Sequence, residues 1–233
     1  MHGFFITGTD TEIGKTHIAQ GLIHLLKQQG YVTTAMKPVS AGCETTEAGL
    51  RNDDAVKLQH ATGLDLDYEL LNPYALEPAI APHIAAEEAG VRINKDRIKE
   101  RFDQLCTQAD AIVVEGAGGW FVPLNETETM ADLAQDLGLP VILVVAIRLG
   151  CLNHTLLSIS AIAQSGLPIA GWVANHVNES GPYDEANIQS LCDRIEPPLL
   201  GRVPYMPGVD AEAVAAHLNL PTHGRAHRPA WSI

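Results

Sequence analysis

The segment from Thr7 to Thr16 carries the residue types that cradle a phosphate group. It reads Thr-Gly-Thr-Asp-Thr-Glu-Ile-Gly-Lys-Thr, with glycines at positions 8 and 14. Glycines let backbone N–H groups curl around a phosphate, and a helix that begins there directs its positive end at the same anion. In this pattern Lys15 would reach the terminal phosphate oxygens and the Thr16 hydroxyl would bind Mg²⁺. The usual loop has four residues between its glycines and this one has five, so it is a lengthened variant.

Glycine, lysine and threonine in this order also occur by chance at the start of an ordinary helix. Here an apolar run at Gly3–Thr7 predicts a strand before the loop, and a helical pattern over Gly14–Gln29 follows it. Because a phosphate loop joins a first strand to a first helix, this context favours phosphate binding.

Two acidic positions could complete a metal site beside the loop. An apolar run ends at Glu115, and an acid that closes a buried strand needs a partner, for which a metal ion is suitable. Asp53 and Asp54 open a predicted helix. Either could be its N-cap, because carboxylates favour helix starts, or one could supply a further oxygen on the Mg²⁺ side.

Lys37 follows the second predicted strand and precedes Pro38. That position lies at the carboxyl edge of the expected sheet, where folds of this class bind ligands. Lys37 is therefore either a second anion clamp or a solvent-facing lysine at a strand end.

Short apolar runs alternate with helical patterns along the chain. Strands are predicted at Gly3–Thr7, Tyr31–Met36, Ala111–Glu115, Pro140–Ile147, Ile169–Ala174 and Leu199–Val203. Helices are predicted at Gly14–Gln29, Leu152–Gln164 and near Glu185–Ile195. Strands that alternate with helices form parallel β-α-β units, so we expect an α/β fold, a doubly wound, mostly parallel sheet with helices on both faces. One domain is expected over residues 1–219, and residues 220–233 form a weakly ordered tail.

Composition narrows the possible partners. The chain has 233 residues with 28 acidic and 15 basic side chains, a net charge of −13. Nucleic acids and anionic membranes require clustered cations, so we expect neither as a partner. The N-terminus has no basic segment before its short apolar stretch, which argues against a signal peptide. The four cysteines lie far apart and form no CxxC pair, as is typical of reduced thiols. We therefore expect a cytoplasmic protein.

Five motifs in order resemble the dethiobiotin synthetase family of the P-loop NTPase superfamily. They are Gly8–Thr16, Lys37–Val39, Glu115–Gly119, Leu149–His154 and Gly171–Asn175, and the resemblance covers about residues 3 to 206. The lengthened phosphate loop is the form found in that family. The resemblance implies a P-loop NTPase fold and an ATP- and Mg²⁺-dependent ligation, the penultimate step of biotin biosynthesis. In it, 7,8-diaminopelargonate and CO₂ form a carbamate, ATP converts the carbamate to a carbamic–phosphoric anhydride, and the second amine closes the ring of dethiobiotin.

The resemblance also implies roles for matching positions. Lys15 and Lys37 would be catalytic, and Lys37 would stabilise the carbamate and the transferring phosphoryl group. Asn175 would bind the adenine. The metal ligands would be Thr16, Asp54 and Glu115. The full ATP-binding set would be Glu12, Ile13, Gly14, Lys15, Thr16, His17, Asp54, Glu115, Gly116, Ala117, Gly118, Asn175, His176, Pro204, Tyr205 and Met206.

The substrate amines and the substrate carboxylate would contact different segments. The implied substrate-binding set is Thr11, Lys37, Ser40, Ala41, Gly150, Cys151, Leu152 and Asn153. Residues 150–153 would hold the carboxylate at a helix N-terminus of the other subunit, which suits an anion. The resemblance therefore implies a homodimer with a shared substrate site.

The chain departs from the family pattern at the edges of the substrate. The family has Ser or Thr at the position of Ala41, so either Ser40 supplies that hydroxyl or the contact is missing. Asn187 stands where a tyrosine is expected, and Tyr183 is a candidate replacement. The alternatives are a catalytically weakened paralogue and a P-loop switch ATPase. Switch proteins usually have a second lysine inside the loop, but residues 9–13 contain none.

Overall fold

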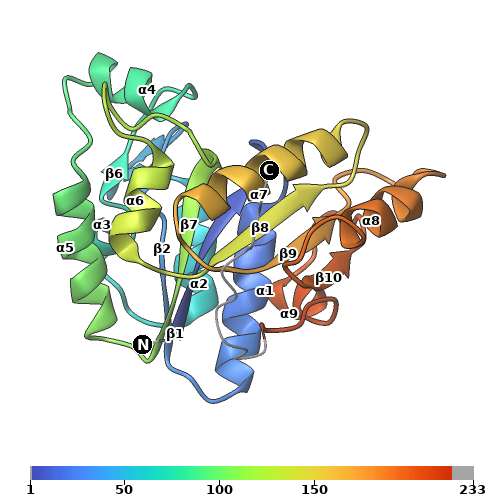
Figure 1. The fold of residues 1–233 in the computed structure, drawn as a ribbon. Helices are drawn as coiled ribbons and strands as arrows, with labels where there is room; N and C mark the ends of the chain where they lie inside the picture. Colours follow the sequence, from blue (N-terminus) through green and yellow to red (C-terminus); the bar gives the residue numbers. More distant parts are fainter. Residues whose placement is uncertain (1, 222–233) are drawn as a thin grey trace.

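Six apolar segments form one parallel sheet at the centre of the molecule (Figure 1). The computed structural model describes residues 2–221. In spatial order the strands are β10-β9-β8-β1-β7-β2. Their bounds are β1 His2–Gly8, β2 Thr33–Met36, β7 Ala111–Gly119, β8 Val141–Ala146, β9 Ile169–Asn175 and β10 Leu199–Val203. β1 lies between β7 and β8, where Phe5 is level with Val114 on one side and Val141 on the other.

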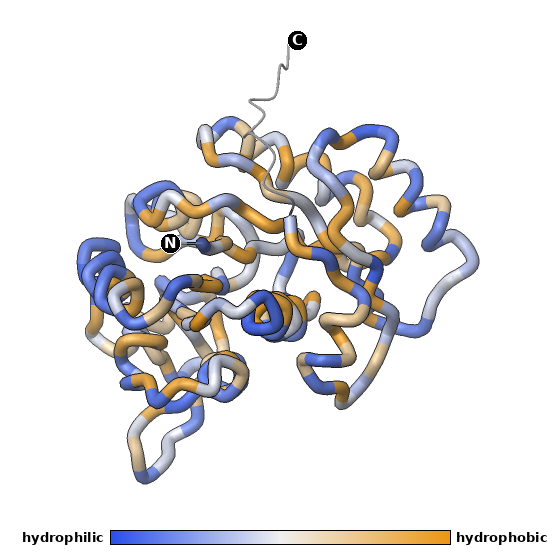
Figure 2. Tube along the Cα trace, turned by 90° about the horizontal axis from the view of Figure 1, so that it is seen from below, coloured by the Kyte–Doolittle hydropathy of each residue, from blue (hydrophilic) through white to orange (hydrophobic). Residues whose placement is uncertain are grey.

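Helices cover both faces of this sheet. They are α1 Lys15–Gln28, α2 Asp53–Thr62, α3 Tyr68–Leu71, α4 Pro82–Glu88, α5 Lys95–Cys106, α6 Met130–Leu137, α7 Cys151–Gln164, α8 Asp184–Cys192 and α9 Ala211–Ala215. Successive strand residues point to opposite faces. Phe5 accordingly belongs to the core shared with α5, α6 and α7, whereas Phe4 and Ile6 belong to the core shared with α1 and α9. The outer helices alternate between hydrophilic and hydrophobic residues (Figure 2). The predicted doubly wound α/β class is confirmed.

The strand order places the predicted motifs at one edge of the sheet. The chain runs from β1 through α1 to β2. It then returns to form β7, which lies between β1 and β2, and continues with β8 on the other side of β1. Ligands bind outside the carboxyl ends of the strands where the winding direction reverses in this manner. The phosphate loop after β1, Lys37 after β2 and Glu115 in β7 therefore converge there.

Several boundaries differ from those predicted. α1 begins at Lys15, because Gly14 has a left-handed φ of +85° and serves as the N-cap. β2 begins at Thr33 rather than Tyr31, and β7 continues past Glu115 to Gly119, where it pairs with Gly8.

The structure also contains elements between residues 39 and 106 that the sequence did not predict. Among them are two small sheets, formed by β3 Val39–Ser40 with β6 Tyr74–Ala75 and by β4 Glu44–Thr46 with β5 Gly49–Arg51. Strands of two or three residues are too short to show an apolar period.

Two further expectations concern membrane-spanning helices and the C-terminal tail. Within residues 2–221, no helix is long and apolar enough to cross a bilayer. The predicted tail over residues 220–233 lies almost wholly outside the described residues, so it stays a prediction.

Candidate active site

The phosphate loop is held in a tight curve by its glycine and by a neighbouring strand. Glu12 adopts a left-handed φ of +57° and Gly14 one of +85°. From the end of β9, the Asn175 side-chain Nδ2 donates to the carbonyl oxygen of Ile13 at 2.7 Å. A Cβ at position 14 would lie 2.3 Å from that nitrogen. Only glycine satisfies both the backbone conformation and this close approach.

Lys15 lies in the first turn of α1 with its ammonium turned back over the loop. Its Nζ donates to the backbone oxygen of Asp10 at 2.8 Å. Within residues 2–221 it forms no ion pair with a carboxylate at contact distance. Burial therefore lowers the pKa of Lys15 from 10.5 to about 8, outweighing the more distant attraction of Glu115 and Asp54. A buried cation with a weak local partner at a helix N-terminus is a site that favours an anion.

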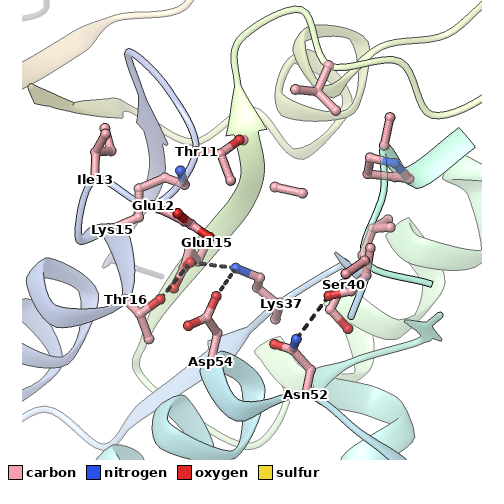
Figure 3. A pocket seen from close by; sticks show the side chains of 18 of the residues that line it. Thr11, Glu12, Ile13, Lys15, Thr16, Lys37, Ser40, Asn52, Asp54 and Glu115 are labelled. Atoms are coloured by element: carbon pink, nitrogen blue, oxygen red, sulfur yellow. Dashed lines mark hydrogen bonds and ion pairs between the residues drawn. The ribbon is translucent and has the colours of Figure 1, made fainter. Parts of the chain in front are cut away.

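Lys37 is the centre of a buried charge cluster beside the loop (Figure 3). Its Nζ lies 2.5 Å from Glu115 Oε1 and 3.0 Å from Asp54 Oδ2. The hydroxyl of Thr16 donates to the same Glu115 oxygen at 3.0 Å. Lys37 is 5% exposed and Glu115 is 1% exposed. The interpretation of Lys37 as a solvent-facing lysine is therefore wrong.

The charges in this cluster stabilise one another. Burial alone would lower the pKa of Lys37, but Glu115 and Asp54 outweigh it and raise that pKa above its ordinary value. Burial likewise acts to raise the pKa of Asp54, and the Lys37 ammonium outweighs it, so that the carboxyl pKa falls. Lys37 is thus a cation and Asp54 an anion at neutral pH.

The structure separates the two aspartates at the start of α2. The N-cap is Asn52, whose side-chain oxygen accepts from the N–H of Ala55 at 3.3 Å. Asp53 forms an ion pair with Lys57 on the surface at 2.5 Å. Asp54 instead faces Lys37. Neither aspartate is the cap, and Asp54 is the member of the pair that faces the site.

The donor set around Glu115 fits a small divalent cation. Within the described residues its second oxygen, Oε2, is buried and has no hydrogen-bond partner. A buried carboxylate oxygen without a partner is costly, and a cation relieves that cost. Two carboxylates and a threonine hydroxyl are the hard oxygen donors that Mg²⁺ prefers, with phosphate oxygens completing the set.

Loop, lysines and carboxylates line one cavity of about 680 Å³. Figure 3 shows Lys37, Asp54 and Glu115 gathered in it, with Thr11 from the phosphate loop above them. The loop before α4 supplies an apolar wall, and Ser40 and Ala41 line the same space. The members of the predicted site that line this cavity are Thr11, Glu12, Ile13, Gly14, Lys15, Thr16, His17, Lys37, Ser40, Ala41, Asp54, Glu115, Ala117 and Gly118.

A smaller cavity of about 200 Å³ adjoins the first and shares Glu12, Gly14 and His17 with it. Its remaining wall comes from the ends of β9 and β10 and the segment that follows. Five residues of the predicted ATP-binding set complete it: Asn175, His176, Pro204, Tyr205 and Met206. His176 is held there by Nδ1, 3.0 Å from the backbone oxygen of Val203. A mostly apolar cavity that adjoins a phosphate loop has the layout of a nucleotide site.

Other predicted residues lie apart from these cavities. Gly116 is packed against Phe5 and Met130 and lines neither cavity. Gly150, Cys151, Leu152 and Asn153 lie at the N-terminus of α7 and also line neither cavity of this chain. The Ser40 hydroxyl donates to Asn72 Oδ1 at 2.8 Å, so it is already engaged inside the protein.

Sequence reasoning missed residues that hold the site from behind. Asn52, Tyr68 and Asn72 join the segment after Lys37 to the start of α2. Arg148 forms an ion pair at 2.6 Å with Asp10 of the phosphate loop. Three of the bonds that tie them to other segments span 16 to 138 residues: Asn52 to Tyr68, Asn72 to Lys37 and Arg148 to Asp10. Only the sequence Asn72-Pro73-Tyr74, a turn signal, marked any of these positions.

Comparison with known proteins gives one consistent result. A family model described as an AAA domain matches residues 2–213. The chain is 53% identical over 221 residues to the ATP-dependent dethiobiotin synthetase BioD of Pseudomonas aeruginosa strain UCBPP-PA14, covering 94% of this chain and 97% of that protein. It is 52% identical over 217 residues to the protein of the same name from Cellvibrio japonicus strain Ueda107, covering 93% and 95%.

Solved structures resemble the fold at much lower identity. A ParA family ATPase from Chlorobium tepidum TLS matches with a TM-score of 0.55 at 15% identity, covering 93% of this chain and 90% of that one. The MinC:MinD cell division complex of Aquifex aeolicus gives a TM-score of 0.57 at 14% identity, covering 93% and 86%. At such identities the likeness shows the fold alone.

Proposed function

Because this chain belongs to the family of ATP-dependent dethiobiotin synthetases, we propose that ATP and 7,8-diaminopelargonate react in its two adjoining cavities. The enzyme is an ATP-dependent ligase that forms dethiobiotin. The observation that carries the proposed site is the buried Lys37 ammonium, which lies between Glu115 and Asp54 beside the phosphate loop. Two lysines, a helix N-terminus and a metal ion would together gather the negative charge of a triphosphate and a carbamate in one place.

In this proposal the nucleotide spans both cavities. The backbone of residues 12–16 and the Lys15 ammonium hold the phosphates, while the smaller cavity holds the adenine. Support comes from the residues shared by the two cavities, Glu12, Gly14 and His17, which give one continuous path. Asn175 fixes Ile13 through Nδ2, so its Oδ1 is the atom left to face the base.

The chemistry proceeds in three steps that conserve atoms. One substrate amine attacks CO₂ and loses a proton, which gives a carbamate. A carbamate oxygen attacks the γ-phosphorus of ATP and ADP leaves, which gives a carbamic–phosphoric anhydride. The second amine attacks the carbonyl carbon, loses a proton and displaces phosphate, which closes the cyclic urea of dethiobiotin. Lys37 compensates the charge on the carbamate and the transferring phosphoryl group, and positioning supplies much of the remaining acceleration.

We assign Thr16, Asp54 and Glu115 as the residues that hold Mg²⁺. An ion held there would supply positive charge to the phosphate oxygens. The unpartnered Oε2 of Glu115 and the oxygen-only donor set support the assignment.

The substrate carboxylate is proposed to lie at the N-terminus of α7 of a second subunit. Gly150, with φ +95°, caps that helix. The N–H of Cys151 donates to Arg148 O at 3.0 Å, so the N–H groups of Leu152 and Asn153 are the ones proposed to bind the carboxylate. Leu149, directly before it, is fully exposed, and Leu157 on α7 is 62% exposed. Large exposed apolar side chains beside a helix start fit a covered interface. Sedimentation velocity at assay concentrations tests the homodimer, and a fully active monomer contradicts the shared site.

Two other properties are part of the proposal. All four cysteines are free thiols, as expected in a reducing compartment, which supports a cytoplasmic enzyme. The switch ATPase alternative has only the shared fold in its favour, since residues 9–13 contain no lysine.

Mass spectrometry of the reaction product tests the activity. Purified protein with Mg²⁺, ATP, bicarbonate and 7,8-diaminopelargonate should yield dethiobiotin and one ADP per ring closed. Omitting bicarbonate should abolish both products. ATP hydrolysis without dethiobiotin would indicate a weakened paralogue or a switch protein instead.

The lowered pKa of Lys15 predicts proton uptake when a nucleotide binds. At pH 8.5 a lysine with a pKa of about 8 is mostly neutral, and a bound phosphate favours its charged form. Binding of ADP in EDTA should therefore take up about 0.7 proton at pH 8.5, and less at pH 7.5. Calorimetry in two buffers with different ionisation enthalpies measures this. Equal uptake in a Lys15→Ala variant would assign the proton to another group.

A further inference from the structure

The segment that carries Lys37 is held by a second segment outside the main sheet. The backbone N–H of Lys37 donates to Leu71 O at 2.8 Å, and the N–H of Leu76 donates to Ser40 O at 2.9 Å. Between these bonds, β3 pairs with β6, with Val39 level with Tyr74. Residues 37–40 therefore depend on residues 71–76 for their position once β2 has ended.

Asn72 is the side chain at the centre of this contact. It is 3% exposed. Its Nδ2 donates to Lys37 O at 2.6 Å, and its Oδ1 accepts from Ser40 Oγ at 2.8 Å and from Tyr68 Oη at 3.1 Å. The partners fix the orientation of the amide, because a flipped side chain would place two carbonyl-type oxygens 2.6 Å apart.

The same side chain also reaches the acidic partner of Lys37. The Tyr68 hydroxyl, which donates to Asn72, accepts from the backbone N–H of Asn52 at 2.8 Å. Asn52 is the N-cap of α2, and Asp54 lies in the first turn of that helix. One buried amide thus connects the backbone that carries Lys37 to the helix start that carries Asp54.

We propose that Asn72 is a positioning residue for the ligase reaction, which sets the placement of the Lys37 ammonium relative to Asp54 and Glu115. The inference rests on the proposed function of this cavity. Misplacement of a reacting group by about 1 Å can cost on the order of 100-fold in rate. The phosphate loop lies between β1 and α1, whereas within residues 2–221 the hydrogen bonds of the Asn72 side chain go to Lys37, Ser40, Tyr68 and Tyr74. Loss of Asn72 therefore lowers kcat and leaves nucleotide affinity in place.

Three substitutions test this, with kcat, the KM for ATP, the Kd for ADP in EDTA and the melting temperature as readouts. Asn72→Ala removes all contacts of the amide and should lower kcat by about 10- to 100-fold. Asn72→Asp keeps the acceptor oxygen for Ser40 and Tyr68 but places a second oxygen where the donor to Lys37 O was, so it should lower kcat by a similar factor. Tyr68→Phe removes the hydroxyl that joins Asn72 to Asn52, but it leaves the Asn72 bonds to Lys37 and Ser40, and it should lower kcat by less. All three should bind ADP within about twofold of wild type, since the phosphate loop is untouched.

Two control variants separate positioning from stability. Leu191→Ala truncates a buried side chain on α8, so it should lower the melting temperature and leave kcat unchanged. Thr34→Val replaces a buried hydroxyl in β2 that has no hydrogen-bond partner within residues 2–221, and it should change neither the melting temperature nor kcat.

If the Asn72 variants lose melting temperature but keep the wild-type kcat, as is expected of Leu191→Ala, the positioning role is wrong. If an Asn72 variant does not fold, Tyr68→Phe decides between the outcomes. A wild type that forms no dethiobiotin overturns the proposed function and this role together, whereas an active wild type with fully active variants overturns this role alone.

Discussion

Replacing Lys37 by alanine is expected to lower kcat by about 10²- to 10³-fold, while the KM for ATP changes little. The ammonium lies at the wall of the main cavity between Glu115 and Asp54. It makes no contact with the smaller cavity that we assign to the base. Removal of one preorganised charge that stabilises a transition state typically costs a factor of this size in kcat. Steady-state kinetics with dethiobiotin as the measured product tests the prediction.

The same substitution should also destabilise the fold. Glu115 is 1% exposed and Lys37 is its ion-pair partner, so Lys37→Ala leaves a buried carboxylate without compensation. Breaking a buried pair from one side costs about 3–5 kcal/mol. The double variant Lys37→Ala/Glu115→Gln removes that uncompensated charge. It should recover much of the lost unfolding free energy in urea and none of the activity, which separates the catalytic role from the structural one.

Lys95→Ala is the matched control for Lys37. Lys95 also lies between two carboxylates, at 2.7 Å from Asp136 and 3.5 Å from Glu128, but it lines neither cavity. These partners are partly exposed and water can solvate them, so the loss of stability should be smaller. Its kcat should equal that of wild type. A fall of less than tenfold for Lys37→Ala would remove Lys37 from the proposed chemistry.

The residues that the sequence revealed are those whose role depends on local context. Lys15 and Thr16 follow a strand and a glycine-containing turn, and their position at the helix start follows from that order alone. Glu115 was marked by the apolar run before it. Each signal lies within a few residues of the side chain that it predicts, so one sequence was enough to find it.

Contacts between distant segments could not be predicted in this way. Asp53 and Asp54 were the helix caps that the sequence suggested, but Asn52 is the cap, and the two aspartates instead form ion pairs with Lys57 and Lys37. Asn72 bonds to Lys37, 35 residues away, through a backbone oxygen that carries no sequence signature. The supporting strands β3 and β6 have two residues each and no period. The motifs therefore located the charges, while the network that fixes their geometry came from the fold.

Replacing Lys15 by alanine should lower kcat by about 10²- to 10³-fold, but it should stabilise the fold, whereas Lys37→Ala should destabilise it. Lys15 should bind the phosphates directly, so both the Kd for ADP and kcat should suffer. Within residues 2–221 the Lys15 ammonium donates one hydrogen bond, to the backbone oxygen of Asp10, and burial lowers its pKa to about 8. Alanine removes the unfavourable burial of this ammonium and leaves no buried carboxylate without a partner, because Glu115 keeps its ion pair with Lys37.

The pH dependence of the unfolding free energy shows how Lys15→Ala changes stability. The unfolded chain holds the Lys15 proton up to pH 10.5 and the folded chain only to about pH 8, so wild-type stability rises with pH between these values. Lys15→Ala should lose that rise, and its gain in stability relative to wild type should be complete below pH 8 and absent above pH 10.5. Lys27→Ala, which removes a lysine at the other end of α1 that also donates to a backbone oxygen, should leave kcat unchanged. If Lys15→Ala kept more than a tenth of the wild-type kcat, or destabilised the fold as strongly as Lys37→Ala, Lys15 would be a structural lysine and the phosphate loop would act through its backbone alone.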